Sequence, residues 1–472
     1  MKTLIMVICF MTIISAQTKY QDINEKISNG DFTKASKLID EIILNGNLSE
    51  TELYNLNFEK EKMDRIRKDF RKTEKDIIEY IKNYYPDISG TDIKKWEEDG
   101  SLEYKVIDGE KYYFNRSHTN LFRINKEAKK RKIEIEGDKK DKLDEFLEAY
   151  LPEVINEAKN KNVSLVKPQK MKINYKLTVD ADAVPEGEII RCWLPFPRKG
   201  YKRQTDIKLI SVNSGNYIIA PNSIMQRTIY LEKESVKGEP TVFEYSLEFT
   251  GLNEWTGIQV DSVKPYKTDS DLYKEFTAER APHIVFTNKI KDLSKEIAGD
   301  ETNKFAIAKK IYKWINDNIP WAGAREYSTI DNISDYCITN GHGDCGIKTL
   351  TFMTLARYNG IPTKWQSGWM LHPGSLNLHD WAEMYLEGYG WVPVDQSFGL
   401  TDSDDEDVRW FFLGGLDAYH FIVNDDYSSD LYPAKIYPRS ETVDFQRGEV
   451  EWKGGNLYFD KWDYHMDVEY LN

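Results

Sequence analysis

The stretch that decides the fold is GHGDCGIKTLTFMTLARYNGIP, residues 341–362. After Cys345, apolar residues recur at the spacing of one helix face, which predicts a helix that packs in a core. Asn359 and Gly360 supply a cap for its C-terminus, and Pro362 stops it. The stripe consists of Ile347, Leu350, Thr351 and either Thr354 or Leu355. The sequence therefore predicts a buried helix that begins at Cys345.

The position of Cys345 at the start of a helix affects the reactivity of its thiol. The N-terminal end of a helix carries a partial positive charge, which stabilises a thiolate. A thiolate of lowered pKa is the form in which cysteine acts as a nucleophile. We therefore predict that Cys345 is a nucleophile with a depressed pKa.

Three glycines around Cys345 also spell G-x-G-x-x-G, the pattern of a dinucleotide-binding loop. They are Gly341, Gly343 and Gly346. We reject that interpretation, because no clear strand precedes the motif and Gln366, twenty residues beyond Gly346, is not the acid that binds ribose. We expect instead that the glycines let the backbone turn sharply, so that Cys345 faces a cleft.

A thiolate needs a base and a group that orients the base. His379 opens the strand-like stretch HDWAEMYL, and Asp395 closes the next one, WVPVD. In an antiparallel hairpin, this imidazole and this carboxylate lie at the same edge of the sheet, where the acid can support the imidazolium. A tight turn centred on Gly388 and Tyr389 would pair Asp395 with Ala382, so this arrangement requires a wider loop or a bulge.

The segments GDC, GIP, HDWAEMY and GWVPVD together resemble the transglutaminase-like superfamily of papain-like cysteine enzymes, in its exported bacterial form. The resemblance is strong from residue 341 to residue 395 and looser from residue 271 to the C-terminus. It implies that Cys345 is the nucleophile, His379 the general base and acid, and Asp395 the orienting acid. A core thiol with an unrelated histidine and aspartate is the alternative.

An oxyanion also needs hydrogen-bond donors. The backbone N–H of Cys345, at the helix start, is one predicted donor. Some members of the family use an upstream side chain as well, and the resemblance makes Trp321, which follows Pro320, the candidate. A tryptophan of the hydrophobic core is the alternative reading of Trp321.

The chain as a whole reads as a multidomain α+β protein. A signal peptide is followed by a mainly helical region with a small β-hairpin at Asp108 and Gly109, then an antiparallel β-sandwich. A papain-like transglutaminase core comes last, in which the helix with the nucleophile packs on an antiparallel sheet, followed by an aromatic C-terminal extension. The predicted boundaries are 1–16, 17–167, 171–255 and 271–472.

The first residues predict export. Lys2 precedes an apolar run from Leu4 to Ile14, and the small residues Ser15 and Ala16 close it. No later apolar stretch is long enough to span a bilayer. We therefore expect a protein that is periplasmic or extracellular after cleavage, without stable insertion into a membrane.

The composition of the chain limits the classes of molecule that the protein is expected to bind. The 472 residues carry a formal net charge of −14, which disfavours binding to nucleic acid. No paired cysteine or histidine spacing indicates a metal, and no cofactor is expected. His342 and His372 lie near the motif and are expected to be loop histidines. A peptide or protein substrate is the partner we expect, and the sequence gives no indication of the oligomeric state.

Two further cysteines remain after the predicted cleavage. Cys192 lies in RCWLPFP among core-like residues, which favours a buried and inert thiol. Cys337 lies eight residues before Cys345, and a bridge between the two would silence the nucleophile.

The predicted function is cleavage of amide bonds through a thioester on Cys345. Hydrolysis is favoured over transamidation, because only a dry site suppresses attack by water. A protein-glutamine transamidase, an amidase that removes glycans from asparagine, and a non-catalytic scaffold that binds peptide or glycan are the alternatives.

Overall fold

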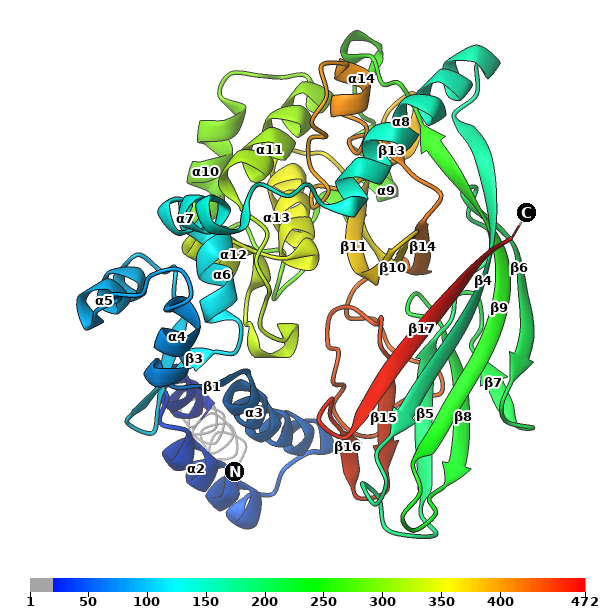
Figure 1. Ribbon diagram of the computed structural model, residues 1–472. Coiled ribbons are helices and arrows are strands. Elements are labelled where there is room, and N and C mark those ends of the chain that lie inside the picture. The colour runs from blue at the N-terminus through cyan, green and yellow to red at the C-terminus, as the bar shows by residue number, and fades with distance from the viewer. Residues whose placement is uncertain (1–19, 472) are drawn as a thin grey trace, which may run out of the picture. The chain divides into compact units, whose positions relative to one another are not determined.

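The computed structural model describes residues 20–471 of the chain. The predicted signal peptide, residues 1–16, lies outside these residues. The chain divides into two compact units, residues 1–137 and 138–472 (Figure 1). Along residues 20–471, no helix is both long enough and apolar enough to cross a membrane.

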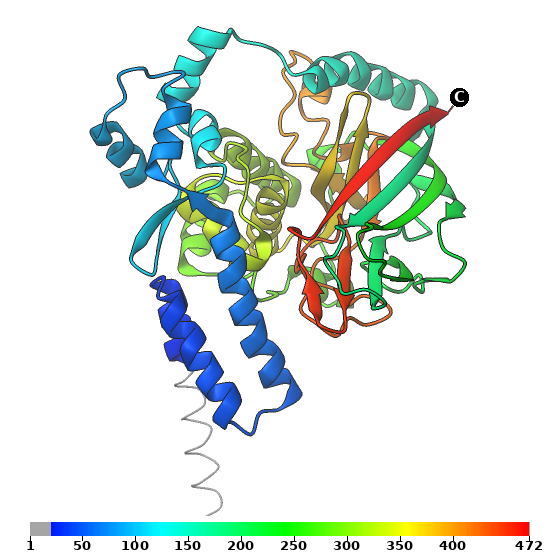
Figure 2. The same ribbon diagram turned by 60° about the horizontal axis from the view of Figure 1, so that its bottom comes forward.

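The described part of the first unit consists of helices and one small sheet. Helices α2 and α3 lie side by side (Figure 2), and the strand order of the sheet is β1-β3-β2. Residues 20–28 are helical, and they are followed by α2 (Phe32–Asn45), α3 (Glu50–Asp69), α4 (Glu74–Ile81), α5 (Gly90–Glu98), α6 (Ser117–Ile124) and α7 (Lys126–Glu136). The strands are β1 (Phe70–Lys72), β2 (Tyr104–Ile107) and β3 (Glu110–Phe114).

The predicted hairpin of the first unit is confirmed. Ile107 of β2 pairs with Glu110 of β3. Asp108 and Gly109 between them both have positive φ, 49° and 91°, as the tightest hairpin turns require. The carboxylate of Asp108 also accepts hydrogen bonds from the backbone N–H and the hydroxyl of Thr33, both at 2.9 Å. These bonds attach the hairpin to α2.

Two antiparallel sheets of the second unit share one hydrophobic core, which confirms the predicted sandwich. One has the order β13-β9-β4-β17, with β6 paired to β9, and the other has the order β16-β15-β5-β8-β7. Every second side chain of β4 from Met171 to Val179 is buried. The strands are β4 (Leu165–Val179), β5 (Ile189–Pro195), β6 (Gln204–Val212), β7 (Tyr217–Ile219), β8 (Thr228–Glu234), β9 (Thr241–Trp255), β13 (Gly415–Leu416), β15 (Glu449–Trp452), β16 (Gly455–Leu457) and β17 (Trp462–Leu471).

The C-terminal strands belong to this sandwich. Strand β17 pairs with β4 without interruption, from Trp462 opposite Val179 to Leu471 opposite Lys170. Figure 1 shows β17 in red alongside β4 and β9. Strand β15 pairs with β5, where Val450 lies opposite Cys192. The sequence of these strands does not indicate which sheet they join, because their partners lie far back in the chain.

The predicted helix at Cys345 is the central helix of the second unit. It is α13 (Cys345–Tyr358), and every residue from Gly346 to Arg357 is buried. It packs against four helices, α9 to α12, and against strands β10 and β11. The helices of the unit are α8 (Lys142–Lys161), α9 (Asp271–Thr277), α10 (Asn288–Ala298), α11 (Lys304–Asn318), α12 (Ile333–Asn340), α13 and α14 (Glu406–Arg409).

A four-stranded antiparallel sheet lies under α13, in the order β12-β11-β10-β14. Its strands are β10 (Thr363–His372), β11 (Ser375–Leu386), β12 (Gly390–Val394) and β14 (His420–Asn424). Trp369 of β10 and Phe421 of β14 belong to the core of the sandwich, whereas Trp365 and Met384 belong to the core around α13. This sheet is therefore covered by helices on one face and by the sandwich on the other.

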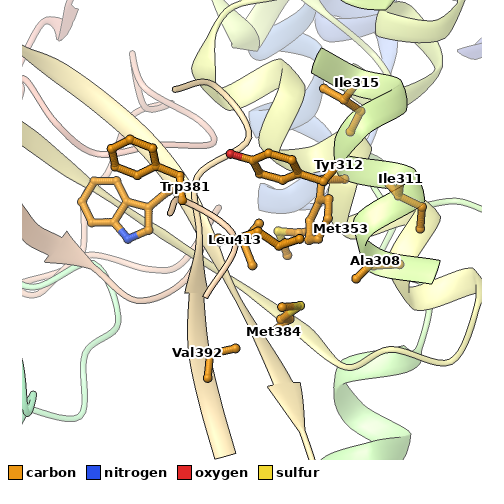
Figure 3. Close-up of a cluster of buried hydrophobic side chains, with 14 of the residues drawn as sticks. Ala308, Ile311, Tyr312, Ile315, Met353, Trp381, Met384, Val392 and Leu413 are labelled. Carbon is orange, nitrogen blue, oxygen red and sulfur yellow. The ribbon is translucent and has the colours of Figure 1, made fainter. Parts of the chain in front are cut away.

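One hydrophobic cluster fixes α13 against α11 and the sheet (Figure 3). Met353 of α13, Ile311 of α11, Met384 of β11 and Val392 of β12 are each at most 1% exposed. Burial of an aliphatic side chain stabilises a fold by roughly 1.5–3 kcal/mol. The cluster therefore holds the helix that carries Cys345 at a fixed height above β11.

Candidate active site

Cys345 is the first residue of α13, as predicted. The side chain of Asp344 caps the helix, and its Oδ1 accepts a hydrogen bond of 3.2 Å from the N–H of Ile347. The chain enters this helix beside Trp321, because Trp321 and Gly343 form a parallel bridge. Trp321 is half-buried. Its backbone is thus near the nucleophile loop, and its role as an oxyanion donor stays a prediction.

The three glycines before and after Cys345 are required for different structural reasons. Only Gly341 has a positive φ, 67°, where it ends α12. A Cβ on Gly346 would lie 2.3 Å from Oη of Tyr327 and 2.7 Å from Oδ2 of Asp380. A Cβ on Gly343 would lie 2.3 Å from the side chain of Ile347. The expectation of a sharp turn at all three is wrong for Gly343 and Gly346, which instead allow close packing beside Cys345.

The Cys345 thiol faces an acid. Its Sγ donates a hydrogen bond to Oδ2 of Asp380 at 3.3 Å. Burial, followed by the carboxylates of Asp380 and Asp344, raises the pKa of Cys345 well above its ordinary value. The expectation of a depressed pKa is therefore wrong for this state. Burial and two neighbouring carboxylates outweigh the partial charge of the helix end.

Asp380 is itself buried, with 1% of its surface exposed. Its Oδ1 accepts a hydrogen bond of 2.7 Å from Nε2 of Gln446. Burial, and then the carboxylate of Asp344, raises the pKa of Asp380 well above its usual range. Asp380 follows His379 directly on β11, and the hydrogen-bond partner of the thiol is therefore Asp380 and not the predicted base.

His379 and Asp395 lie side by side, as predicted. Nε2 of His379 is 2.6 Å from Oδ2 of Asp395. His379 lies on β11, and Asp395 directly follows the end of β12 at Val394. The last pair of this ladder is Ala382 with Val394, and the loop between the strands comprises residues 387–389. The expected wider loop is confirmed, because it is one residue longer than the two-residue turn and leaves Asp395 just beyond the ladder, where it reaches His379.

The carboxylate of Asp395 is held by several donors. Its Oδ1 accepts backbone N–H bonds from Ser397 at 2.9 Å and from Phe398 at 3.0 Å. Its Oδ2 accepts from His379 and from a second imidazole, that of His420, at 3.1 Å. Burial would raise the pKa of Asp395, but the two imidazoles outweigh burial and hold the pKa below its usual range. Asp395 is therefore ionised and fixed in orientation.

His420, the first residue of β14, continues the network to Asp417 and His372. Nδ1 of His420 is 3.0 Å from Oδ1 of Asp417, and Nε2 of His372 is 3.0 Å from Oδ2 of the same carboxylate. All three residues are at most 3% exposed. The expectation that His372 is a loop histidine is wrong, because it is the buried last residue of β10. Sequence reasoning missed His420 and Asp417 entirely.

The histidines and aspartates of this network are also residue types that ligate metal ions. Two overlapping groups, His372 with Asp417 and His420, and His379 with Asp395 and His420, bring ligand atoms within 4.8 Å of one another. Their close nitrogen–oxygen separations, 2.6 to 3.1 Å, are those of hydrogen bonds. Each oxygen of Asp417 also faces a different imidazole. We therefore describe these residues as a hydrogen-bonded network.

Cys192 and Cys337 are free and fully buried. Burial raises the pKa of Cys192 well above its ordinary value and that of Cys337 to about 12. The prediction of a buried thiol at Cys192 is confirmed.

Residues 291–396 match the family model of the transglutaminase-like superfamily. This segment is a transglutaminase-like core domain. The transglutaminase-like core contains α11, α12, α13 and the hairpin of β11 and β12. It therefore includes all three residues of the predicted triad.

Several proteins are similar to this chain. An uncharacterized protein of Haemophilus influenzae is 25% identical over 307 residues, which are 55% of this chain and 81% of that protein. The crystal structure of a putative cysteine protease from Cytophaga hutchinsonii aligns with 65% of this chain and 92% of its own, at 14% identity and a TM-score of 0.44. The periplasmic domain of TgpA from Pseudomonas aeruginosa aligns with 49% of this chain and 88% of its own, at 11% identity and a TM-score of 0.25.

Proposed function

We propose that the protein is an exported cysteine enzyme that acts on amide bonds of peptides or proteins, with Cys345, His379 and Asp395 as its triad. One observation carries the proposal: Nε2 of His379 lies 2.6 Å from Oδ2 of Asp395, which is the imidazole–carboxylate pair that a triad requires. The transglutaminase-like core supports a cysteine enzyme in general terms. The leader-like residues 1–16 support export.

The tautomer of His379 follows from its partner. Because an ionised carboxylate only accepts hydrogen bonds, Nε2 carries a proton toward Asp395. Nδ1 is then the ring nitrogen with a lone pair for the thiol proton. In the proposed first step, the proton of Cys345 passes to Nδ1 while the sulfur attacks the amide carbon. The backbone N–H of Cys345, together with Trp321, holds the oxyanion that forms.

The tetrahedral intermediate then collapses. The carbon–nitrogen bond breaks, and protonated His379 gives its proton to the leaving amine. A thioester on Cys345 remains. Water attacks it and gives a proton to His379, the carbon–sulfur bond breaks, the acid leaves, and His379 returns the proton to the sulfur. A second amine in place of water would give transamidation. We favour hydrolysis, because water is abundant unless a site excludes it.

The raised pKa of Cys345 decides when the thiolate forms. The buried thiol, whose hydrogen-bond partner is Asp380, stays neutral in the resting protein. His379 therefore acts as a general base during attack, rather than as half of a preformed ion pair. Substrate that displaces the thiol from Asp380 would start the reaction.

The experiment compares Cys345→Ala with Cys337→Ala on a protein substrate such as casein. Cys337 is a matched control, since it is also a free thiol in the same core domain. We expect peptide fragments from the unmodified chain and from the control, and none from Cys345→Ala. Full cleavage by Cys345→Ala overturns the proposal.

A labelled primary amine, added with a glutamine-bearing protein, separates the two acyl acceptors. Release of fragments or of ammonia without label supports hydrolysis. Covalent incorporation of the label, lost in Cys345→Ala, assigns transamidation instead. Binding of the substrate protein without any product supports the non-catalytic scaffold.

A further inference from the structure

The imidazole of His420 lies between two carboxylates in the interior of the second unit. Its Nε2 is 3.1 Å from Oδ2 of Asp395, and its Nδ1 is 3.0 Å from Oδ1 of Asp417. The side chains of all three residues are completely buried. The proposed triad does not use His420 or Asp417, so the presence of this second acid–imidazole pair needs its own explanation.

The hydrogen bonds fix the protonation of His420. Both oxygens of Asp395 already accept, from His379, Ser397 and Phe398. Asp417 accepts from the N–H of Tyr419 at 2.9 Å and faces the imidazole of His372. Two carboxylates that only accept require a donor at each nitrogen of the ring between them. His420 is therefore an imidazolium.

The electrostatics agree with this reading. Burial would lower the pKa of His420, but Asp417 and Asp395 outweigh burial and raise it to about 9. The pKa of Asp417 is held well below its usual range, since the imidazoles of His372 and His420 outweigh its burial. For His372, burial dominates and lowers the pKa, so that ring is neutral. Buried charges thus alternate along the network, which keeps two carboxylates ionised without solvent.

The charge on His420 acts on the proposed base through a shared atom. His379 and His420 both bond to Oδ2 of Asp395, and their ring centroids are 5.3 Å apart. A cation already on that oxygen opposes the arrival of a second one. The two imidazoles therefore compete for the charge of one carboxylate oxygen.

We propose that Asp417 and His420 are positioning residues, which orient the ionised Asp395 and weaken its support for protonated His379. The inference rests on the proposed function for its effect on turnover, while the charge of His420 stands without it. Other charged or titratable groups face this network. Lys348 and Tyr312 act on Asp395, and Arg203, Tyr150 and Tyr419 act on Asp417.

The first test measures the charge of His420 in protein that cannot react. Cys345→Ala, without a histidine tag and with ¹⁵N-labelled histidine, is followed by imidazole NMR at pH 8. An ordinary histidine has a pKa near 6.5 and is neutral there. We expect one of the seven rings to keep protons on both nitrogens. A spectrum with neutral rings alone overturns the inference, whatever the enzyme does.

The second test is Asp417→Asn, which keeps an oxygen for Tyr419 and removes one of the two charges that hold His420 protonated. With less positive charge on Asp395, His379 takes the thiol proton more easily. We expect iodoacetamide to alkylate Cys345 about tenfold faster at pH 7. A change of about one pKa unit corresponds to a tenfold change in the equilibrium for proton transfer. Turnover should fall, because the proton is then returned less readily.

The exposed Asp404→Asn is the control, and its alkylation rate should equal that of the unchanged chain. A merely structural Asp417 would leave the alkylation rate unchanged or lower it along with turnover, and this result overturns the inference. If Asp417→Asn does not fold, the NMR experiment decides by itself. Absence of turnover in the unchanged chain, with a doubly protonated ring at pH 8, would reject the proposed enzyme and keep the charged His420.

Discussion

Two buried aspartates of the site have opposite electrostatics. Asp380 lies beside the thiol and Asp395 behind the imidazole, and each is at most 1% exposed. Burial and neighbouring carboxylates raise the pKa of Asp380, whereas two imidazoles overcome burial at Asp395 and lower its pKa. The difference teaches that burial alone does not set the charge of an acid here. A cationic partner does, and only Asp395 has hydrogen bonds to imidazoles.

The comparison predicts its largest effect at Asp395. Asp395→Asn keeps the shape but removes the charge that stabilises protonated His379, and an amide can impose the wrong tautomer. We expect kcat to fall by about 10³–10⁴-fold, the scale known for this change in a triad. Steady-state turnover on the cleaved substrate checks it. A loss below about tenfold would contradict the role given to Asp395.

Asp380 should respond in the opposite sense. Asp380→Asn removes the carboxyl group 3.3 Å from Sγ, whose ionisation opposes that of the thiol, and leaves a group that can donate to a thiolate. The pKa of Cys345 should fall, and alkylation at pH 7 should be about tenfold faster or more.

The matched control for Asp380→Asn is Asp444→Asn, which removes another buried carboxylate of raised pKa. Its effect on alkylation should be smaller, because the pKa of Cys345 depends first on burial and then on Asp380 and Asp344. Equal rates for the two variants would contradict a specific effect of Asp380.

The two acids should also affect the free energy of unfolding, by about 1–3 kcal/mol each and with opposite dependence on pH. The lowered pKa of Asp395 stabilises the fold above pH 4 or so, and this contribution is lost as the pH falls. The raised pKa of Asp380 means that folding favours its protonated form, so stability is lost as the pH rises above about 4.

Thermal unfolding at pH 5 and pH 8 checks both signs. Relative to the unchanged chain, Asp380→Asn should gain stability at pH 8 more than at pH 5. Asp395→Asn should lose stability at both values, and the loss should shrink only at more acidic pH. Parallel shifts of both variants with pH would contradict the contrast between the two acids.

Local patterns predicted much of this fold. The period of the residues after Cys345 and the Asn-Gly cap identify α13, because both signals lie within one helix. The alternation along β4 identifies a sandwich strand for the same reason. The family resemblance added His379 and Asp395, since the motif fixes their spacing. The pairing of β17 with β4 could not be predicted, because no local pattern encodes a partner so distant in sequence.

The missed part of the site has a different cause. Asp417 and His420 lie in DAYH, whose spacing matches no motif for chemistry. Their importance appears only when β14 is placed next to β10, which brings His420 to Asp395. The raised pKa of Cys345 was missed because the helix position is visible in sequence, but the burial of Asp380 against Gly346 is not.

The position of β17 has a consequence for biosynthesis. Strand β4 cannot gain its ten-residue neighbour until the ribosome has translated Trp462 to Leu471, long after β4 itself. Until then one edge of the central pair of strands stays open, and contacts so distant in sequence form slowly. A truncation that removes only this strand would leave the outer edge of β4 without its partner.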